Sequence, residues 1–279
     1  MIHLERLIET SDGRIIDGDL GPCGAVCYIR SSYGVCSLIV ADEAWSSWSQ
    51  SELPHVRNVR WMSKDRVSLW SLPLKAGSND AVRAYKKSGS VGVPVGQPRD
   101  IVFGQRVYFA CYGEEAYLAA NDGDLASHLI AAFDESGAFL FGLGGCLKDG
   151  RIDGAIDVSL GCITEDDEGI FLLYPSNDLW RVLPNKANVD KISFPIDVRG
   201  LSALSAAKDK IFFASASASG FLLGHLDTRS GTVEEDGEIS YSHLGIITTD
   251  LDSRFRIRGC ANGTMLIKTD TRIWRVSLT

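Results

Sequence analysis

The sequence predicts an all-β fold, a six-bladed β-propeller of four-stranded antiparallel blades, and three observations support this prediction. Two short motifs recur along the chain at multiples of about 47 residues. Within each repeat, a polar pair precedes an apolar run of strand-forming residues. Six such repeats account for nearly all of the 279 residues, so we expect one propeller domain spanning residues 1–279.

The first motif combines an apolar or aromatic residue, charged residues, Ser and Gly. It is "AFDESGAFLFG" at residues 132–142, and a related segment, "AYKKSGSV", lies 48 residues upstream at 84–91. A third copy, "HLDTRSGTV", occupies residues 225–233, about two repeats further on. The motif is typical of a tight turn between two strands.

The second motif is "DLWRVLP" at 178–184 and "RIWRVSL" at 272–278, with Trp180 and Trp274 again two repeats apart. We expect each motif to mark the end of the third strand of a blade. The six markers are Val40, Tyr85, Phe133, Leu183, Leu226 and Val276.

The second strand of each blade is predicted from the apolar runs that follow a polar pair. The pair suits a tight turn, and the β-branched and aromatic residues after it suit a strand buried between stacked sheets. The runs are "DRVSLWSL" from residue 65, "QRVYFACY" from 105, "EGIFLLY" from 168, "DKIFFASA" from 209 and "NGTMLIK" from 262.

The chain ends on a predicted third strand, so the last blade lacks a fourth strand from its own repeat. The segment "IHLERLI" at residues 2–8 is placed to supply it. We therefore expect the N-terminal strand to close the ring by pairing with residues 272–278.

Residues 133–174, "FDESGAFLFGLGGCLKDGRIDGAIDVSLGCITEDDEGIFLLY", resemble NHL-type repeats and their six-bladed relatives. The resemblance covers the predicted blades 3 to 6 best, and it implies the fold rather than an activity. The six-bladed relatives include calcium-dependent lactonases and related hydrolases, which hold a metal in the central channel. Carried over to this chain, the resemblance would place ligands near Asp17, Asn58, Asp100, Asp157 and Asp250.

The sequence itself favours neither a metal nor a cofactor. Of those five positions only Asp157 lies well inside a predicted strand, and a calcium site needs several oxygen ligands together. The acidic run "ITEDDEG" at 163–169 lacks the spacing of a calcium loop, and we expect a solvated hairpin turn there. The five histidines are scattered, no G-x-S-x-G motif occurs, and the seven cysteines suit reduced, mostly buried thiols.

The charge balance points to a particular kind of partner. The chain carries 28 Lys and Arg against 36 Asp and Glu, a formal net charge of −8. This disfavours direct nucleic-acid binding and favours encounter with a basic protein. The N-terminal residues have neither the apolar run of a secretory signal nor that of a membrane span, so we expect a cytoplasmic location and no membrane partner.

Functional residues are expected where the repeat is interrupted. The main interruption is "GEEAYLAANDGDLAS" at 113–127, an acidic insertion between the second and third strands of blade 3, where we expect the neighbouring hairpins to need two to eight residues. The segments 48–55, 145–154 and 242–254 connect blades and share that rim. The candidate partner-binding residues are Trp48, Glu52, Glu114, Glu115, Asp122, Asp124, Asp149, Asp153, Asp250 and Asp252.

These observations predict a non-catalytic protein-binding propeller. An acidic inhibitor or immunity-type protein that occludes a basic partner, such as a toxin nuclease, fits the charge. The alternative is a calcium-dependent, lactonase-like hydrolase with a metal in its channel.

Overall fold

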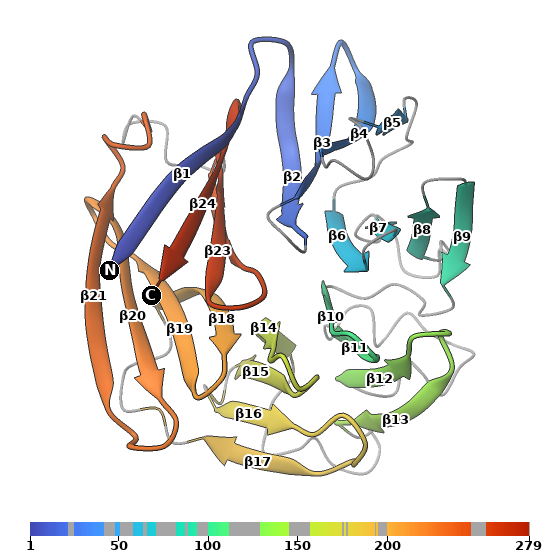
Figure 1. The fold of residues 1–279 in the computed structure, drawn as a ribbon, viewed down its shortest axis with the longest axis vertical. Helices are drawn as coiled ribbons and strands as arrows, with labels where there is room; N and C mark the ends of the chain where they lie inside the picture. The colour runs from blue at the N-terminus through green and yellow to red at the C-terminus, as the bar shows by residue number, and fades with distance from the viewer. Residues whose placement is uncertain are drawn as a thin grey trace. The chain divides into compact units, whose positions relative to one another are not determined.

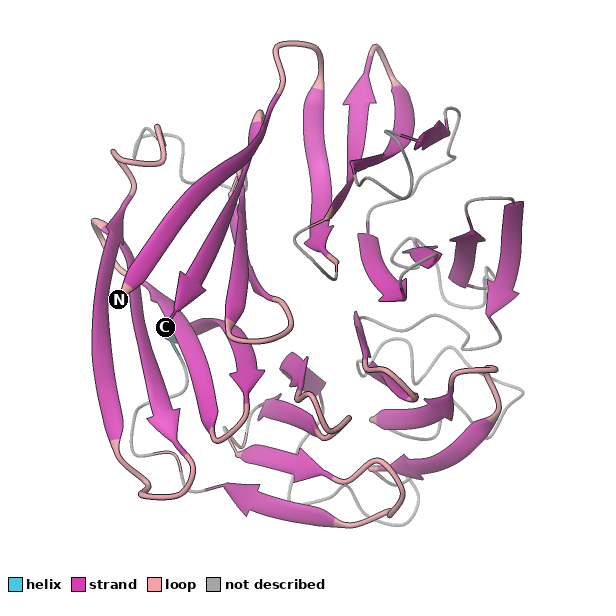
Figure 2. Cartoon of the chain, viewed as in Figure 1, coloured by secondary structure: helices cyan, strands magenta, loops and turns pink. Residues whose placement is uncertain are grey.

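A computed structural model describes the chain over residues 1–21, 25–41, 48–50, 58–63, 66–70, 82–86, 89–93, 100–111, 129–144, 157–174, 176, 178–192, 194, 200–246 and 255–278. Regular structure in these ranges is almost entirely β-strand (Figure 2). Within them, no helix is long and apolar enough to cross a membrane.

Within the described ranges the strands form six four-stranded antiparallel sheets (Figure 1). In five of them consecutive strands are neighbours, and in the sixth the N-terminal strand adds to the last strand of the chain. We number the strands of each sheet first to fourth in this order. The chain divides into two compact units, residues 1–54 with 193–279 (unit 1) and residues 55–192 (unit 2), and each is described by itself.

Unit 1 contains three sheets. The first comprises β2 (Arg14–Leu20), β3 (Val26–Ser32), β4 (Val35–Ala41) and β5 (Trp48–Gln50). The second comprises β18 (Leu201–Ala207), β19 (Lys210–Ala216), β20 (Gly220–Asp227) and β21 (Val233–Ser240). The third comprises β22 (Arg256–Gly259), β23 (Thr264–Lys268), β24 (Arg272–Leu278) and β1 (Ile2–Glu9).

Unit 2 also contains three sheets. The first comprises β6 (Asn58–Ser63), β7 (Arg66–Trp70), β8 (Val82–Lys86) and β9 (Gly89–Val93). The second comprises β10 (Asp100–Phe103), β11 (Val107–Cys111), β12 (Ile130–Asp134) and β13 (Phe139–Leu143). The third comprises β14 (Asp157–Ile163), β15 (Gly169–Tyr174), β16 (Leu179–Val182) and β17 (Val189–Ile192).

The N-terminal strand completes the sheet that holds the end of the chain. β1 pairs antiparallel with β24, from Ile2 opposite Leu278 to Glu9 opposite Arg272. The predicted pairing of residues 2–8 with residues 272–278 is therefore confirmed.

The sequence repeats coincide with equivalent strands of the sheets. The five apolar runs form the second strands β7, β11, β15, β19 and β23. Five of the six markers lie in third strands, and Leu183 directly follows the third strand β16. The assignment of these two strand types from the sequence is thus confirmed.

The Asp and Gly of the recurring motif shape the turn between the third and fourth strands. Asp134 Oδ1 accepts hydrogen bonds from the backbone nitrogens of Ser136 and Ala138, both at 2.9 Å. Asp227 Oδ1 does the same for two backbone nitrogens of its own turn, at 2.8 and 2.9 Å. Gly137 has a φ of 91°, a conformation that glycine adopts without a steric penalty. The copies at 132–142 and 225–233 thus form equivalent turns between third and fourth strands.

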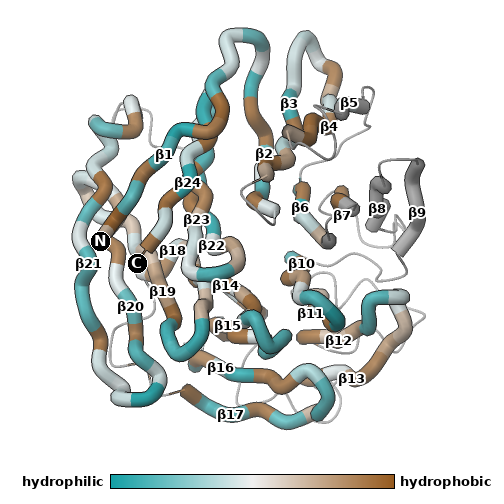
Figure 3. The backbone as a smooth tube through the Cα atoms, viewed as in Figure 1, coloured by the Kyte–Doolittle hydropathy of each residue, from teal (hydrophilic) through white to brown (hydrophobic). Residues whose placement is uncertain are grey.

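Hydrophobic cores fill the space between neighbouring sheets of the same unit. In unit 2, Phe109 of β11 packs edge-on against Phe171 of β15, with ring centroids 5.4 Å apart. In unit 1, Phe221 of β20 belongs to a core that also includes Ile267 of β23. Figure 3 shows the apolar colours concentrated on strands and the hydrophilic colours on many of the turns. Both faces of the second strands are buried, as their continuous apolar sequence predicts.

One expectation about the connections is wrong. We expected the hairpins other than the acidic insertion to need at most eight residues. However, the connection from β7 to β8 spans residues 71–81, so unit 2 contains a second long connection between a second and a third strand. This connection was not predicted because residues 71–81, unlike the acidic insertion, have no excess of one charge.

Candidate functional site

Nine of the ten candidate partner-binding residues lie outside the described residues. They are Glu52, Glu114, Glu115, Asp122, Asp124, Asp149, Asp153, Asp250 and Asp252. Trp48 opens β5, and its side chain is likewise outside the described part. The strands that flank these segments nevertheless fix where each connection leaves its sheet.

The positions that the resemblance suggested as metal ligands fall on first strands. Asp17 lies within β2, Asn58 opens β6, Asp100 opens β10 and Asp157 opens β14. The side chain of Asp157 lies outside the described part of the chain, as does all of Asp250.

In unit 1, Asp17 is paired with an arginine that the sequence analysis did not single out. Asp17 is buried, with its side chain 3% exposed, and Arg258 of β22 holds it with Nη1 3.1 Å from the carboxylate. The same Nη1 donates to the carbonyl oxygen of Gly18 at 2.9 Å. Asp17 is therefore one half of a buried ion pair between two sheets.

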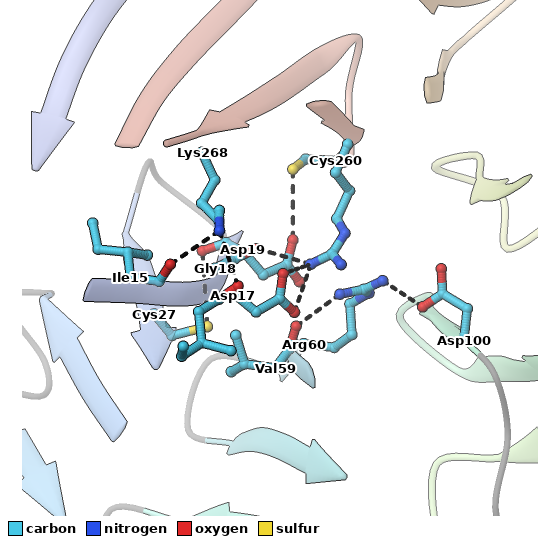
Figure 4. A network of polar contacts seen from close by, with 12 residues as sticks. Ile15, Asp17, Gly18, Asp19, Cys27, Val59, Arg60, Asp100, Cys260 and Lys268 are labelled. Carbon is cyan, nitrogen blue, oxygen red and sulfur yellow. Dashed lines mark hydrogen bonds and ion pairs between the residues drawn. The ribbon is translucent and has the colours of Figure 1, made fainter. Parts of the chain in front are cut away.

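Asp19 of β2 and Cys260, which directly follows β22, lie next to this ion pair (Figure 4). The Cys260 thiol donates to Asp19 Oδ1 at 3.5 Å, and the same carboxylate oxygen accepts from the backbone nitrogen of Leu20 at 3.0 Å. Burial, reinforced by the charge of Asp19, raises the pKa of the Cys260 thiol well above its ordinary value. A thiol of this kind stays protonated at neutral pH and is a poor nucleophile.

Lys268 of β23 completes the cluster, which we call the Asp17 cluster (Asp17, Asp19, Arg258, Cys260 and Lys268). Its side chain is buried, and Nζ donates to the carbonyl oxygens of Ile15 at 3.0 Å and Ile16 at 3.2 Å. Burial lowers the pKa of Lys268 to about 8, although the carboxylates of Asp270 and Asp17 act in the opposite direction. The Lys268 ammonium thus binds two backbone carbonyls at the start of β2, where the strand has a bulge. Burying the charged ammonium is itself unfavourable, which is why its pKa is lowered.

We expect the substitution Lys268→Met to reveal this penalty through its pH dependence. Because the folded-state pKa is depressed, the unfolded chain binds more protons between pH 8 and about 10.5, so the wild type gains stability as pH rises through this window. The lowered pKa corresponds to a loss of roughly 3 kcal/mol from the free energy of unfolding of the wild type, and this loss is fully present below pH 8. Urea unfolding at pH 7 and near pH 10 measures it.

The quantity to compare is the wild-type free energy of unfolding minus that of Lys268→Met. Buried cysteines titrate in the same range with the opposite sign, but they contribute equally to both proteins and cancel. A difference that stays constant across this pH range would contradict the assigned pKa.

In unit 2, a second arginine pairs with another of the suggested ligands (Figure 4). Arg60 of β6 places Nη2 2.5 Å from Asp100 Oδ1 of β10. Its Nη1 donates to the carbonyl oxygen of Val59 at 2.9 Å, and the buried Ser68 hydroxyl donates to the Arg60 carbonyl oxygen at 3.3 Å. This pair joins two neighbouring first strands, as the Asp17 and Arg258 pair does in unit 1.

The sequence contained a signal for these arginines. The first-strand segment "FRIRGC" has arginine at alternate positions, and "VRNVRWM" places Arg60 between the apolar Val59 and Trp61. An arginine repeated with the period of a buried strand needs a carboxylate partner, because an unpaired buried charge is strongly unfavourable. The predictions from the sequence did not include these arginine–carboxylate pairs.

The described buried charges therefore serve to join sheets. Asp17 and Asp100 are each paired with arginine, which opposes cation binding at these positions. Among the described residues no group of three or more His, Cys, Asp or Glu side chains is arranged to hold a metal ion. Cys27, Cys36, Cys111, Cys162 and Cys260 are free thiols, as expected, and burial raises the pKa of Cys162 to about 12.

The acidic run at 163–169 differs from the expected solvated turn at one residue. Glu165 and Asp166 are exposed, but Asp167 is 1% exposed and binds the turn between β10 and β11. It accepts hydrogen bonds from the backbone nitrogens of Gln105 at 2.5 Å and Arg106 at 3.2 Å. Asp167 thus joins two sheets of unit 2, a role that needs tertiary structure to recognise.

The acidic insertion leaves one end of the sheet β10–β13. It joins β11 to β12 through residues 112–129, and the connection from β13 to β14 begins at the same end, because alternate strands of an antiparallel sheet run in the same direction. Asp100 pairs with Cys111, so the first strand also begins there. In the next sheet the equivalent end carries Tyr174, whose side chain is 53% exposed.

No family model matches the sequence, and no curated protein is similar to it. Among solved structures, the chain is similar to a catalytically inactive virginiamycin B lyase from Staphylococcus aureus with quinupristin, at 15% identity and a TM-score of 0.54 over 100% of both chains. An oxidoreductase of the glucose dehydrogenase type from Thermus thermophilus aligns at 13% identity and a TM-score of 0.54, over 99% of this chain and 100% of that one.

The β-propeller domain of the Trilobed protease from Pyrococcus furiosus aligns at 12% identity and a TM-score of 0.50, over 94% of this chain and 79% of that one. At such identities the similarities show the fold alone. Since these proteins differ in activity, the fold does not decide whether this chain is catalytic.

Proposed function

We propose that this β-propeller is a non-catalytic binding module that holds a basic protein at the end of sheet β10–β13 where the acidic insertion begins. The net charge of −8 favours encounter with a cationic partner. The insertion then gives that attraction a defined position on the molecule.

The observation that carries the proposal is a connection that is both long and acidic. The connection from β7 to β8, residues 71–81, is also long, but it contains one Lys and one Asp. Between the second and third strands, sheet β10–β13 has residues 112–129, whereas four other sheets have 33–34, 175–178, 217–219 and 269–271. The longer connection contains Glu114, Glu115, Asp122 and Asp124 and no Lys or Arg. Long connections in compact domains are usually functional, and this one adds a local field of one sign.

Two further features support an interface at this kind of sheet end. Tyr174 exposes an aromatic ring at the equivalent position of the neighbouring sheet, and aromatic residues are enriched at binding hot spots. The buried charges on the first strands are committed to pairs between sheets, which is a structural use. Occlusion of a cationic enzyme site, such as that of a toxin nuclease, would be the inhibitory form of this function.

The test is to reverse the charge of Glu114, Glu115, Asp122 and Asp124 together. We expect the association rate with a partner captured from the native cell to fall by roughly 10–1,000-fold at low salt, because steering by charge acts mainly on association. The effect should shrink as salt screens it. Stopped-flow or surface-based kinetics at several salt concentrations measures both.

A matched control reverses four exposed carboxylates on described turns and strands, Glu135, Glu165, Asp166 and Glu235. It changes the net charge by the same amount, so a purely global effect would slow both variants equally. An equal effect of the two variants, or none, would refute the assigned location.

The proposal includes the predicted six-bladed ring, with each four-stranded sheet as one blade and β1 closing the last. Its support is the recurrence of the same meander and the pairing of β1 with β24. A closed ring places the ends of second and fourth strands on one rim.

A further inference from the structure

The amide of Asn58, at the start of β6, is a buried polar group that the surrounding protein does not satisfy. The residue is 7% exposed, yet Nδ2 has no hydrogen-bond acceptor among the residues that the structure describes. Leaving a buried donor unpaired is unfavourable, and a group of this kind calls for an explanation such as an ordered water or a ligand.

Asn58 shares its face of β6 with Arg60, because side chains two residues apart on a strand point the same way. Arg60 in turn contacts Asp100 at the start of the neighbouring strand β10. The Asn58 amide is therefore on the same face of β6 as the arginine of this ion pair, and both Asn58 and Asp100 open first strands.

Asp100 has one carboxylate oxygen to offer. Its two hydrogen bonds within the described part of the chain, from Arg60 Nη2 at 2.5 Å and from the Ile101 backbone nitrogen at 2.8 Å, both go to Oδ1. The Asp100 side chain is 33% exposed, so it is partly accessible to solvent. The site thus combines Asp100 Oδ2, which accepts no hydrogen bond from the described residues, with the donor and acceptor of the Asn58 amide.

The charges at this site select against ions. A cation at Asp100 would meet the Arg60 guanidinium on the same carboxylate, and an anion would meet the carboxylate itself. A neutral group needs to displace neither partner. The Asn58 amide can turn about its Cβ–Cγ bond, which exchanges its nitrogen and oxygen, and so it can present either atom to a ligand.

We infer that Asn58 and Asp100 form a binding site for a neutral amide group, one that presents a C=O and an N–H side by side. The ligand carbonyl accepts from Asn58 Nδ2, and the ligand N–H donates to Asp100 Oδ2 or Asn58 Oδ1. Such a group belongs either to a free small amide or to a peptide segment. Asp100 lies at the end of sheet β10–β13 where the acidic insertion also begins. The inference rests on the Asn58 amide and the Asp100 carboxylate alone, so it does not depend on the proposed function.

The direct test follows the side-chain NH2 signals of Asn58 by 15N nuclear magnetic resonance of the full chain. Propionamide serves as the small amide and N-acetyl-triglycine amide as the peptide. We expect a saturable shift of the Asn58 signals, at lower concentration for whichever source the site fits. Calcium chloride is the third titrant, because a metal site at the same residues would respond to it instead.

Substitution separates a ligand site from a structural position. Asn58→Leu removes the unpaired donor, so we expect its midpoint of thermal unfolding to rise by about 2–4 °C while stabilisation by the amide probe is lost. Asn185→Leu makes the same chemical change at an exposed turn residue of the same unit, and it should leave the probe response intact. Asn58→Ser provides a second variant if leucine prevents folding.

Three outcomes would overturn the inference. The Asn58 signals could show no saturable response to either amide, in which case an ordered water satisfies the donor. They could respond to calcium alone. Asn58→Leu could retain the probe response of the wild type, which would place amide binding elsewhere.

Discussion

Replacing Asp17 with leucine is expected to lower the free energy of unfolding by about 3–5 kcal/mol, because it leaves the Arg258 guanidinium without its buried carboxylate. For a chain of this length the midpoint of thermal unfolding should fall by roughly 10 °C. Urea unfolding and calorimetry measure the two quantities. The loss arises from the uncompensated charge rather than from lost packing, since leucine has a similar volume.

That explanation makes a second, sharper prediction. In the double variant Asp17→Leu with Arg258→Met both charges are gone, and most of the lost stability should return. Arg229→Leu, which removes an exposed ion pair with Asp209 in the same unit, should change stability by less than about 1 kcal/mol. If the double variant were no more stable than Asp17→Leu alone, the buried pair would not be the cause.

Replacing Asp167 with alanine is expected to lower the free energy of unfolding by about 3 kcal/mol. The substitution removes the acceptor for two backbone nitrogens of the turn between β10 and β11, and for Arg106 Nε at 3.0 Å. It also places alanine at a φ of 63°, where asparagine and aspartate are tolerated better. Chemical unfolding of the variant measures the sum of these effects.

Two variants separate the backbone contribution from that of the hydrogen bonds. Asp167→Asn keeps a residue suited to the positive φ and one acceptor oxygen, so it should lose less stability than alanine. Asp166→Ala, at the exposed neighbouring position, should stay within about 0.5 kcal/mol of the wild type. A similar loss for Asp166→Ala and Asp167→Ala would attribute the effect to the turn as a whole.

Much of the strand architecture was predictable because it depends on local rules repeated along the chain. Tight turns with Asp and Gly, and apolar runs after polar pairs, identify strands without knowledge of the contacts between them. The pairing of residues 2–8 with residues 272–278 was also predictable. The last repeat supplies only three strands, and residues 2–8 are a strand-forming segment that belongs to no other repeat.

The candidate site was predicted less well. Asp17 and Asp100 were considered as metal ligands, but each is held by an arginine from a neighbouring first strand. Asp167 looked like one more exposed carboxylate in an acidic run, and only the approach of the β10–β11 turn buries it. The acidic insertion and its partner remain predictions, since those residues lie outside the described part of the chain.

The sequence by itself determined which segments become strands, how they repeat and where the repeat is interrupted, because hydrophobic period and turn chemistry act over a few residues. Only the tertiary structure decided which buried arginine pairs with which carboxylate. Arg258 and Asp17 are far apart in the chain, and Asn58 Nδ2 has no acceptor among the described residues because of the neighbours that the fold gives it. Whether a buried polar group finds a partner depends on distances between sheets, and no local sequence pattern encodes these distances.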